Sequence, residues 1–264
     1  MNNFKALFAP LKRIFYFMNR SLKIFFRGMS WLFNSKEHTN YSFKLNNFQI
    51  QSIGYIISEF FKIDYHKVLE EIKTTQAFEI KKIKNRIFKT IDLDFVAKWD
   101  YRLIPYLLVK FKNVENIFEF GVDQGRLGLL LSKLNDSEPG KYNFQYFGIE
   151  SNQRKAVLVD NLHSEKFNII FNNLENEINN FSNSQLNNSL IISSTHNIPS
   201  EKYLFDYLSK QQIYPQYIIS DRASQNSSYK KFVLQNEYIE TVVVFHDSNE
   251  FLTTNYIGIA KRNF

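Results

Sequence analysis

From residue 116 onward, short apolar runs of four to six residues alternate with stretches of helical periodicity. Runs of this length suit buried strands. The predicted strands are 117–120, 146–150, 168–171, 190–193, 217–220, 240–245 and 256–260. Helical stretches follow most of them, at 125–134, 152–163, 200–210 and 228–235. Because such alternation builds a parallel sheet, and only the short segment 246–255 joins the last two strands, we expect an α/β fold whose seven-stranded, mostly parallel sheet ends in an antiparallel hairpin.

The chain before residue 113 has a different pattern. Residues 48–90 carry an apolar stripe at helical spacing, and residues 94–111 indicate a further helix. A polar stretch over 34–47 is typical of a linker. We therefore expect three parts: an N-terminal helix within 1–36, a helical extension or lid over 48–112, and the α/β domain over 113–264.

The N-terminal segment is amphipathic and basic. On a helix over residues 11–33, the apolar side chains share one face, and the opposite face carries Lys12, Arg13, Arg20, Lys23 and Arg27. Charges interrupt the apolar runs too often for a spanning helix or a signal peptide. Such a helix can lie on an anionic membrane surface, pack on its own domain or on a second subunit, or act as a mitochondrial presequence. The sequence leaves these readings and the oligomeric state open.

Charge and composition narrow the function classes. The net charge is +7, but seven of the 33 basic residues precede residue 37, which leaves 26 basic residues against 26 acidic ones. A nucleic-acid enzyme spreads positive charge over its working face, so we expect no nucleic-acid partner. The chain has no cysteine, which excludes disulfides, thiolate metal sites and cysteine nucleophiles. No tight cluster of Asp, Glu and His is visible in the sequence, so we expect no metal.

Spaced glycines follow the first predicted strand, in the run IFEFGVDQGRLG from residue 117 to 128. Glycines at such a turn let the backbone approach a ligand or, alternatively, let a strand and helix pack tightly. The second strand ends in Glu150, where a carboxylate can accept both hydroxyls of a ribose or can favour a helix N-terminus. The glycine spacing does not match the GxGxxG of dinucleotide-binding enzymes.

These residues carry a resemblance to a known family. The run EFGVDQG resembles motif I of class I S-adenosyl-L-methionine (SAM)-dependent methyltransferases, and GIE, which ends in Glu150, resembles their acidic post-motif. The runs LIISST and YIISDR, at 190–195 and 217–222, are similar to a narrower group of methyltransferases linked to surface-polysaccharide synthesis. The resemblance implies a Rossmann-like methyltransferase fold over about 60–262 and SAM as the cofactor. Asp123 departs from the family because it stands where the middle glycine usually lies, and we expect its side chain to crowd the cofactor loop.

The resemblance also implies roles for individual residues. Asn172 or Asn173 would face the adenine, Ser194 would close the pocket, and Glu119 would lie near the methionine amino end. The cofactor-binding residues implied are Glu119, Gly121, Gly125, Glu150, Asn172 and Ser194.

The predicted catalytic residues lie at carboxyl ends of strands, where α/β proteins bind their ligands. His196 is the first candidate for a general base and Asp221 the second, because a hydroxyl acceptor must lose a proton. Arg222 is expected to hold a phosphate or carboxylate of the acceptor. The alternatives are that His196 is a capping or surface residue and that Asp221 and Arg222 form a structural ion pair. His246 also lies at a strand end.

The leading hypothesis is a cytoplasmic O-methyltransferase for a glycan or glycolipid-type acceptor, with its N-terminal helix peripheral to the inner face of the membrane. The alternative is a non-catalytic Rossmann-like binding module that docks through this helix. Asp123 and the lack of an obvious acceptor motif favour the alternative.

Overall fold

The computed structural model describes residues 47–76, 102–123, 125–152, 162, 164–195, 197–221, 223, 226–246 and 254–263. The predicted N-terminal helix lies outside these residues. So do 77–101 and all but residues 152 and 162 of the predicted helix over 152–163.

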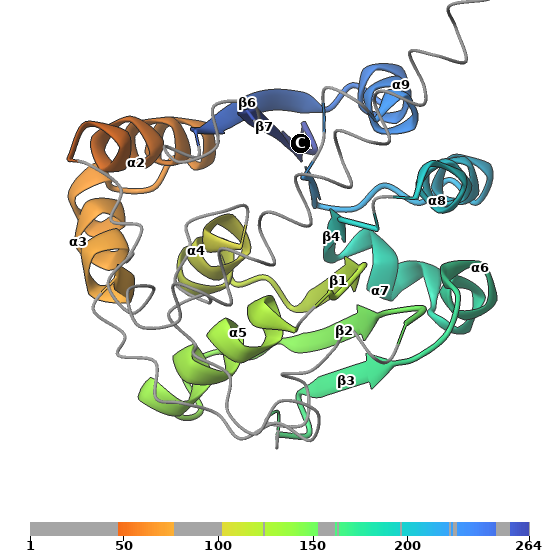
Figure 1. Cartoon of the computed structure of the whole chain (residues 1–264), viewed down its shortest axis with the longest axis horizontal. Helices are drawn as coiled ribbons and strands as arrows, with labels where there is room; N and C mark the ends of the chain where they lie inside the picture. The colour runs from red at the N-terminus through yellow and green to blue at the C-terminus, as the bar shows by residue number, and fades with distance from the viewer. Residues whose placement is uncertain are drawn as a thin grey trace, which may run out of the picture. The chain divides into compact units, whose positions relative to one another are not determined.

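All seven predicted strands are present, each within two residues of its expected bounds. They are β1 (Asn116–Phe120), β2 (Gln145–Ile149), β3 (Phe167–Ile170), β4 (Ser189–Ser193), β5 (Tyr217–Ser220), β6 (Ile239–His246) and β7 (Thr254–Lys261). They form one sheet in the order β3-β2-β1-β4-β5-β7-β6 (Figure 1). The first five strands pair in parallel, and β7 pairs antiparallel with both β5 and β6. The expected Rossmann-like methyltransferase fold, with its C-terminal antiparallel hairpin, is therefore confirmed.

Where the structure describes them, the helices follow the predicted pattern with two differences. Over residues 47–76, the described part of the stripe predicted over 48–90, there are two helices, because Lys62 adopts a left-handed backbone (φ 54°) and Asp64 then caps a new helix through the Lys67 N–H. The Asn-rich stretch between β3 and β4 also forms short helical turns that its weak periodicity did not predict. The described helices are α2 (Asn47–Phe61), α3 (Tyr65–Gln76), α4 (Leu103–Lys112), α5 (Arg126–Ser137), α6 (Leu174–Glu177), η4 (Ile178–Asn180), α7 (Asn183–Asn187), α8 (Ile198–Lys210) and α9 (Ser227–Gln235).

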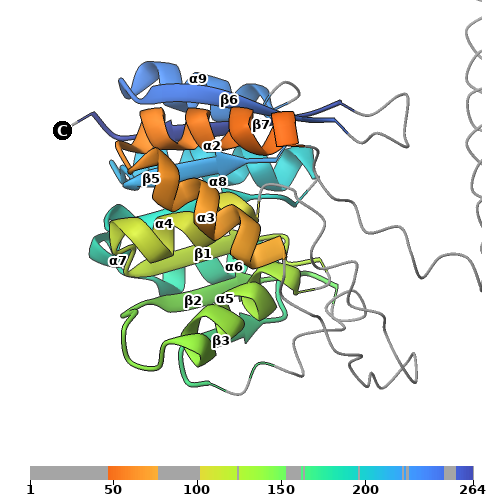
Figure 2. The same ribbon diagram turned by 90° about the vertical axis from the view of Figure 1, so that its left-hand side faces the viewer.

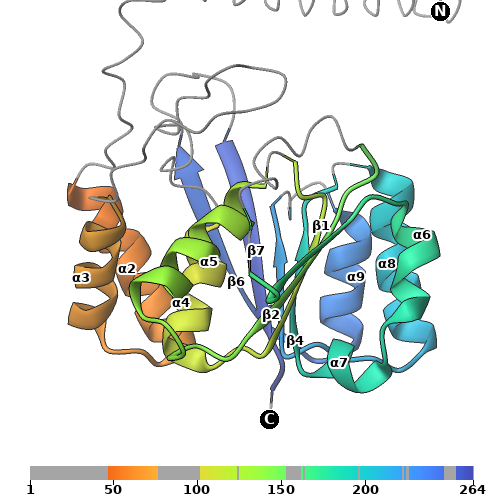
Figure 3. The same ribbon diagram turned by 90° about the horizontal axis from the view of Figure 1, so that it is seen from below.

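Helices cover both faces of the sheet (Figure 3). On one face, α2, α3, α4 and α5 bury apolar side chains against alternate sheet positions such as Ile117 and Ile192. Figure 2 looks onto this side of the sheet. On the other face, α6, α7, α8 and α9 pack on the intervening positions, such as Phe118 and Ile191. Because both faces are covered, the strands read as continuous apolar runs.

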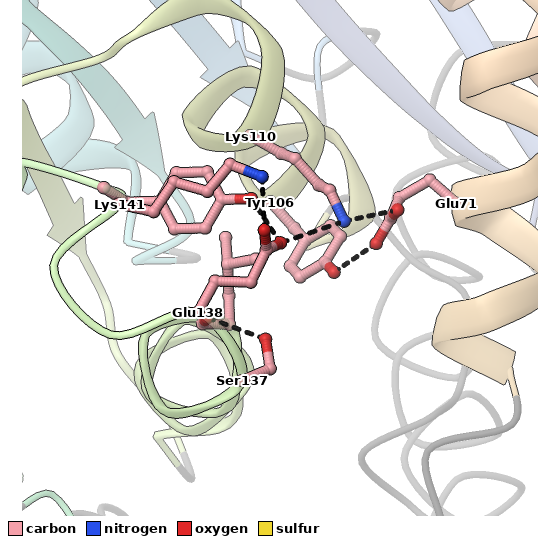
Figure 4. A network of polar contacts seen from close by, with 8 residues as sticks. Glu71, Tyr106, Lys110, Ser137, Glu138 and Lys141 are labelled. Carbon is pink, nitrogen blue, oxygen red and sulfur yellow. Dashed lines mark hydrogen bonds and ion pairs between the residues drawn. The ribbon is translucent and has the colours of Figure 1, made fainter.

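A polar network joins α3 to α4 and α5 (Figure 4). Glu71 accepts a 2.5 Å hydrogen bond from the Tyr106 hydroxyl and pairs with the Lys110 ammonium at 2.5 Å. Lys110 also lies 3.7 Å from Glu138, to which Lys141 donates. Glu71 is only 9% exposed at its side chain, so the Lys110 charge and the Tyr106 hydroxyl satisfy a nearly buried carboxylate. The network thus adds a specific polar connection to the apolar packing of α3.

Within the described part of the chain, no helix is long and apolar enough to cross a membrane.

Candidate functional site

The loop after β1 passes so close to the end of β4 that it requires glycine. Gly121 has φ +90°, and a Cβ atom added there would lie 2.6 Å from the carbonyl carbon and oxygen of Ser194. The Gly121 N–H donates to the Ile149 carbonyl at 2.9 Å, and the Ser194 hydroxyl donates to the Gly121 carbonyl at 2.7 Å. The loop is therefore fixed to both neighbouring strands. Ser194, predicted only to close the pocket, also holds the glycine turn in place.

Asp123 adopts the backbone conformation that a glycine would take. Its φ is 52°, in the left-handed region, where Asp and Asn are the most tolerated residues after glycine. Two residues later, Gly125 has φ +86° and begins α5. The Asp123 side chain is 52% exposed and lies 4.0 Å from the Arg102 guanidinium. The loop thus keeps the turn expected of a glycine motif, with a carboxylate added at its middle position.

Glu150 follows β2 directly and is only 5% exposed. One of its carboxylate oxygens accepts the Asp123 N–H at 3.0 Å, and the other accepts the Asn152 N–H at 2.9 Å. These bonds fix the orientation of the carboxylate. Each oxygen still has capacity for a second hydrogen bond, because an ionised carboxylate has about four acceptor sites. Glu150 can therefore brace the loop and accept donors from a ligand at the same time.

A pocket of about 370 Å³ opens at this edge of the sheet, where β1, β2, β3 and β4 end. Of the described residues that line it, only Asp123 and Glu150 are charged. Four of the predicted cofactor residues meet here: Gly121, Glu150, Asn172 and Ser194. The lining residues are Phe120, Gly121, Asp123, Ile149, Glu150, Ser151, Asn172, Asn173, Leu174, Ser194, Thr195, Asn197 and Ser200.

Glu119 is not among the residues that line the pocket. Its side chain is fully buried on the face of the sheet covered by α4 and α5, and it accepts a short hydrogen bond from the Tyr146 hydroxyl. Burial, and then the Glu119 carboxylate, raises the pKa of Tyr146 well above its usual value. Tyr146 therefore stays a proton donor to Glu119 at neutral pH.

Asn172 lines the pocket, but its amide is already engaged with α6. Its nitrogen donates to Glu177 at 2.6 Å, and its oxygen accepts the Asn173 N–H at 2.8 Å and the Asn176 side-chain amide at 3.2 Å. Asn173 is also in the pocket wall, one position further on. Of the two asparagines that the sequence offered for the adenine, Asn173 is the N-cap residue of α6, and its side chain makes no capping hydrogen bond.

Arg102, which the sequence did not single out, lies just before α4 and is only 11% exposed at its side chain. Burial lowers the pKa of Arg102, while the nearby carboxylates of Glu119, Asp123 and Asp221 oppose that shift. A buried guanidinium is stable when carboxylates surround it. Because these partners come from the ends of β1 and β5 and from the glycine loop, no local pattern in the sequence could have revealed the cluster.

Of the three predicted catalytic residues, the structure describes one. Asp221 follows β5, is 6% exposed, and donates its backbone N–H to the Ser193 carbonyl at 3.3 Å. It is near Arg102 but is not among the residues that line the pocket. His196 and Arg222 lie outside the described residues. The catalytic assignments of all three therefore stay predictions.

No protein-family model matches the chain, and a search of curated proteins finds no match. Several solved structures are similar in part. They include precorrin-6y C5,15-methyltransferase from Geobacter metallireducens (TM-score 0.45, 11% identity, 61% of this chain and 87% of that chain). They also include M. capricolum TrmK in complex with S-adenosyl-homocysteine (0.44, 13%, 62% and 69%) and Aeropyrum pernix fibrillarin with bound SAM (0.40, 11%, 56% and 67%).

Proposed function

We propose that this protein is a SAM-dependent methyltransferase. The observation that carries the proposal is Glu150, a nearly buried carboxylate at the end of β2 that two backbone N–H groups orient into the pocket wall. A ribose presents two adjacent hydroxyl donors, and a fixed carboxylate at this strand end is suited to accept them. The resemblance of the glycine loop to motif I supports the same ligand.

The charge of the pocket favours a cationic nucleoside over other ligands of Rossmann-like folds. Its described charged residues are the carboxylates of Asp123 and Glu150. A pyrophosphate attached to a ribose on Glu150 would face the half-exposed Asp123 carboxylate as a like charge. SAM instead carries a sulfonium, which the same carboxylate attracts.

SAM, when bound, supplies an electrophilic methyl group on its sulfonium. The protein then has to hold an acceptor in line and take its proton. As part of the proposal, the acceptor is a hydroxyl of a glycan or glycolipid, with His196 or Asp221 as its base and Arg222 holding an anionic group of the acceptor. The resemblance of 190–195 and 217–222 to methyltransferases of polysaccharide synthesis supports this finer assignment.

The alternative, a non-catalytic binding module, drew its support from two features: the expectation that Asp123 crowds the loop, and the lack of an obvious acceptor motif. The left-handed conformation at Asp123 removes the first, because the residue occupies the turn without displacing the loop from Ile149 or Ser194. We therefore keep methyl transfer as the proposed function.

Calorimetric titration with SAM and S-adenosyl-homocysteine (SAH) tests the proposal. We expect the wild-type chain to bind both, and Glu150→Ala to weaken SAH binding by roughly ten- to a hundredfold, since the ribose loses charge-assisted hydrogen bonds. Glu165→Ala removes an exposed acid elsewhere on the domain and is the matched control, with unchanged affinity expected. Circular dichroism confirms that each variant is folded. No detectable binding of either ligand by the wild-type chain would refute the proposal.

The position of the protein in the cell is part of the same proposal. Residues 11–33 form a basic amphipathic pattern that supports a peripheral attachment to anionic membrane at its cytoplasmic face. Co-sedimentation with vesicles rich in phosphatidylserine compares the full chain with one that lacks residues 1–36. We expect the truncated chain to stay in the supernatant, and equal sedimentation of the two would rule out the attachment.

A further inference from the structure

Asp123 lies beside the proposed ribose site and also faces the pocket. Its backbone N–H donates to Glu150 at 3.0 Å, on the same carboxylate that is proposed to accept the ribose. Asp123 is among the residues that line the pocket, and its side chain is 52% exposed. A ligand whose ribose lies on Glu150 therefore has the Asp123 carboxylate within reach of the groups attached to that ribose.

Arg102 forms an ion pair with this carboxylate. The guanidinium is 4.0 Å from Asp123 and only 11% exposed, whereas Asp123 is half exposed, so the pair has a buried base and an accessible acid. Arg102 also lies near the carboxylates of Glu119 and Asp221 and near the guanidinium of Arg126. Among the described residues, Asp123 is the accessible carboxylate of this cluster, because its side chain is 52% exposed while Arg102 is 11% exposed. The exposed end of the cluster therefore presents an acceptor to a cation.

We propose that Asp123, positioned by Arg102, is a specificity residue that recognises positive charge on the ligand arm beyond the ribose. The inference rests on the proposed function. In SAM, that arm carries two cations, a sulfonium and an α-ammonium, while SAH keeps only the ammonium. Asp123 in place of the middle glycine then strengthens cofactor binding, in contrast to the crowding expected from the sequence.

Three ligands distinguish which cation, the sulfonium or the α-ammonium, Asp123 recognises. SAM carries both cations, SAH only the ammonium, and 5′-methylthioadenosine neither, although it has the same nucleoside and thioether. We expect Asp123→Asn to weaken SAH binding about five- to tenfold, as measured by calorimetry, because a charge-assisted hydrogen bond becomes a neutral one. Methylthioadenosine affinity is expected to stay within about twofold, which also shows that the variant pocket is intact. A larger loss for SAM than for SAH would add the sulfonium to the recognised groups.

Two further variants sharpen the test. Asp123→Gly restores the usual residue of the motif and suits φ 52°, so the fold is retained. We expect it to lose SAH affinity as Asp123→Asn does. Asp136→Asn removes an exposed acid from α5 and controls for net charge, with unchanged affinity expected. Tighter SAH binding by Asp123→Gly, or an equal loss for SAH and methylthioadenosine, would overturn the proposal.

The positioning role of Arg102 has its own readout, the ratio of SAH to methylthioadenosine affinity. Arg102→Gln is expected to lower this ratio because Asp123 is no longer restrained, and Arg102→Lys to restore part of it. A ratio unchanged in Arg102→Gln would show that the arginine is purely structural. If the wild-type chain bound none of the three ligands, the proposed function itself would be refuted. That outcome differs from the loss of the charge preference alone, so the two proposals can fail separately.

Discussion

Replacing Gly121 with alanine tests how tightly the glycine loop is bound to β4. The added Cβ would lie 2.6 Å from the Ser194 carbonyl group and 2.7 Å from the Thr195 Cα, and these backbone atoms cannot rotate away. A left-handed backbone costs alanine about 1–2 kcal/mol. Forcing an extra carbon into packed atoms costs about 1–3 kcal/mol more. We therefore expect Gly121→Ala to lower the free energy of unfolding by about 2–5 kcal/mol.

Gly140→Ala is the matched control, because Gly140 also has a left-handed backbone (φ +76°) but has no atom within 4 Å of the added Cβ. It should cost only the conformational term of about 1–2 kcal/mol. The entropy that alanine removes from the unfolded chain is common to both variants and cancels in the difference. Urea denaturation followed by circular dichroism gives both values. A difference of less than about 0.5 kcal/mol would mean that the contact with Ser194 is not a constraint.

Three further predictions follow from the buried polar contacts. Tyr146→Phe removes the donor to fully buried Glu119 and should lower the free energy of unfolding by about 1–3 kcal/mol, measured by urea denaturation. Glu71→Gln leaves Lys110 without its closest carboxylate and should lower the free energy of unfolding by more than about 1 kcal/mol in the same assay. The control Lys62→Gln, at an exposed ion pair, should lower it by less than about 0.5 kcal/mol. Equal losses in the two variants would contradict a structural role for Glu71. Stability should also fall above about pH 10, because the folded state holds the raised-pKa Tyr146 phenol protonated while the unfolded state ionises with the ordinary tyrosine pKa of about 10; denaturation at pH 8 to 11 should show a weaker decline for Tyr146→Phe.

The sheet could be predicted from the sequence because its strands are buried on both faces and therefore appear as apolar runs between polar turns. The runs ending at Phe120 and Ser193 show this, since each lies in the centre of the sheet with helices on both sides. The short turns of α6 and η4 could not be predicted, because they depend on contacts of single side chains such as Leu174 and Ile178 with the core. The start of α7 was missed although Ser182 and Gln185 form a capping box, which is a local signal. The division of the chain into parts at residues 36 and 112 stays a prediction.

The sequence predicted only those parts of the candidate site that lie within a short run of residues. The glycine loop and Glu150 each belong to such a run, and the structure brings them into one pocket. Arg102 and Tyr146 were missed because their partners are distant in the sequence: Tyr146 bonds Glu119 across two strands, and Arg102 lies near residues from β1 and β5. The engagement of Asn172 with α6 was likewise invisible before α6 was known.

The left-handed backbone at residue 123 also limits how this position can change during evolution. Glycine, asparagine and aspartate are among the residues that adopt such a conformation most readily, and the codons of glycine and aspartate, like those of aspartate and asparagine, differ by one base. A lineage can therefore move between a neutral and a negative pocket rim by single mutations that leave the loop backbone in place. The charge at the pocket rim can thus change by mutation and be selected while the backbone of the site stays the same.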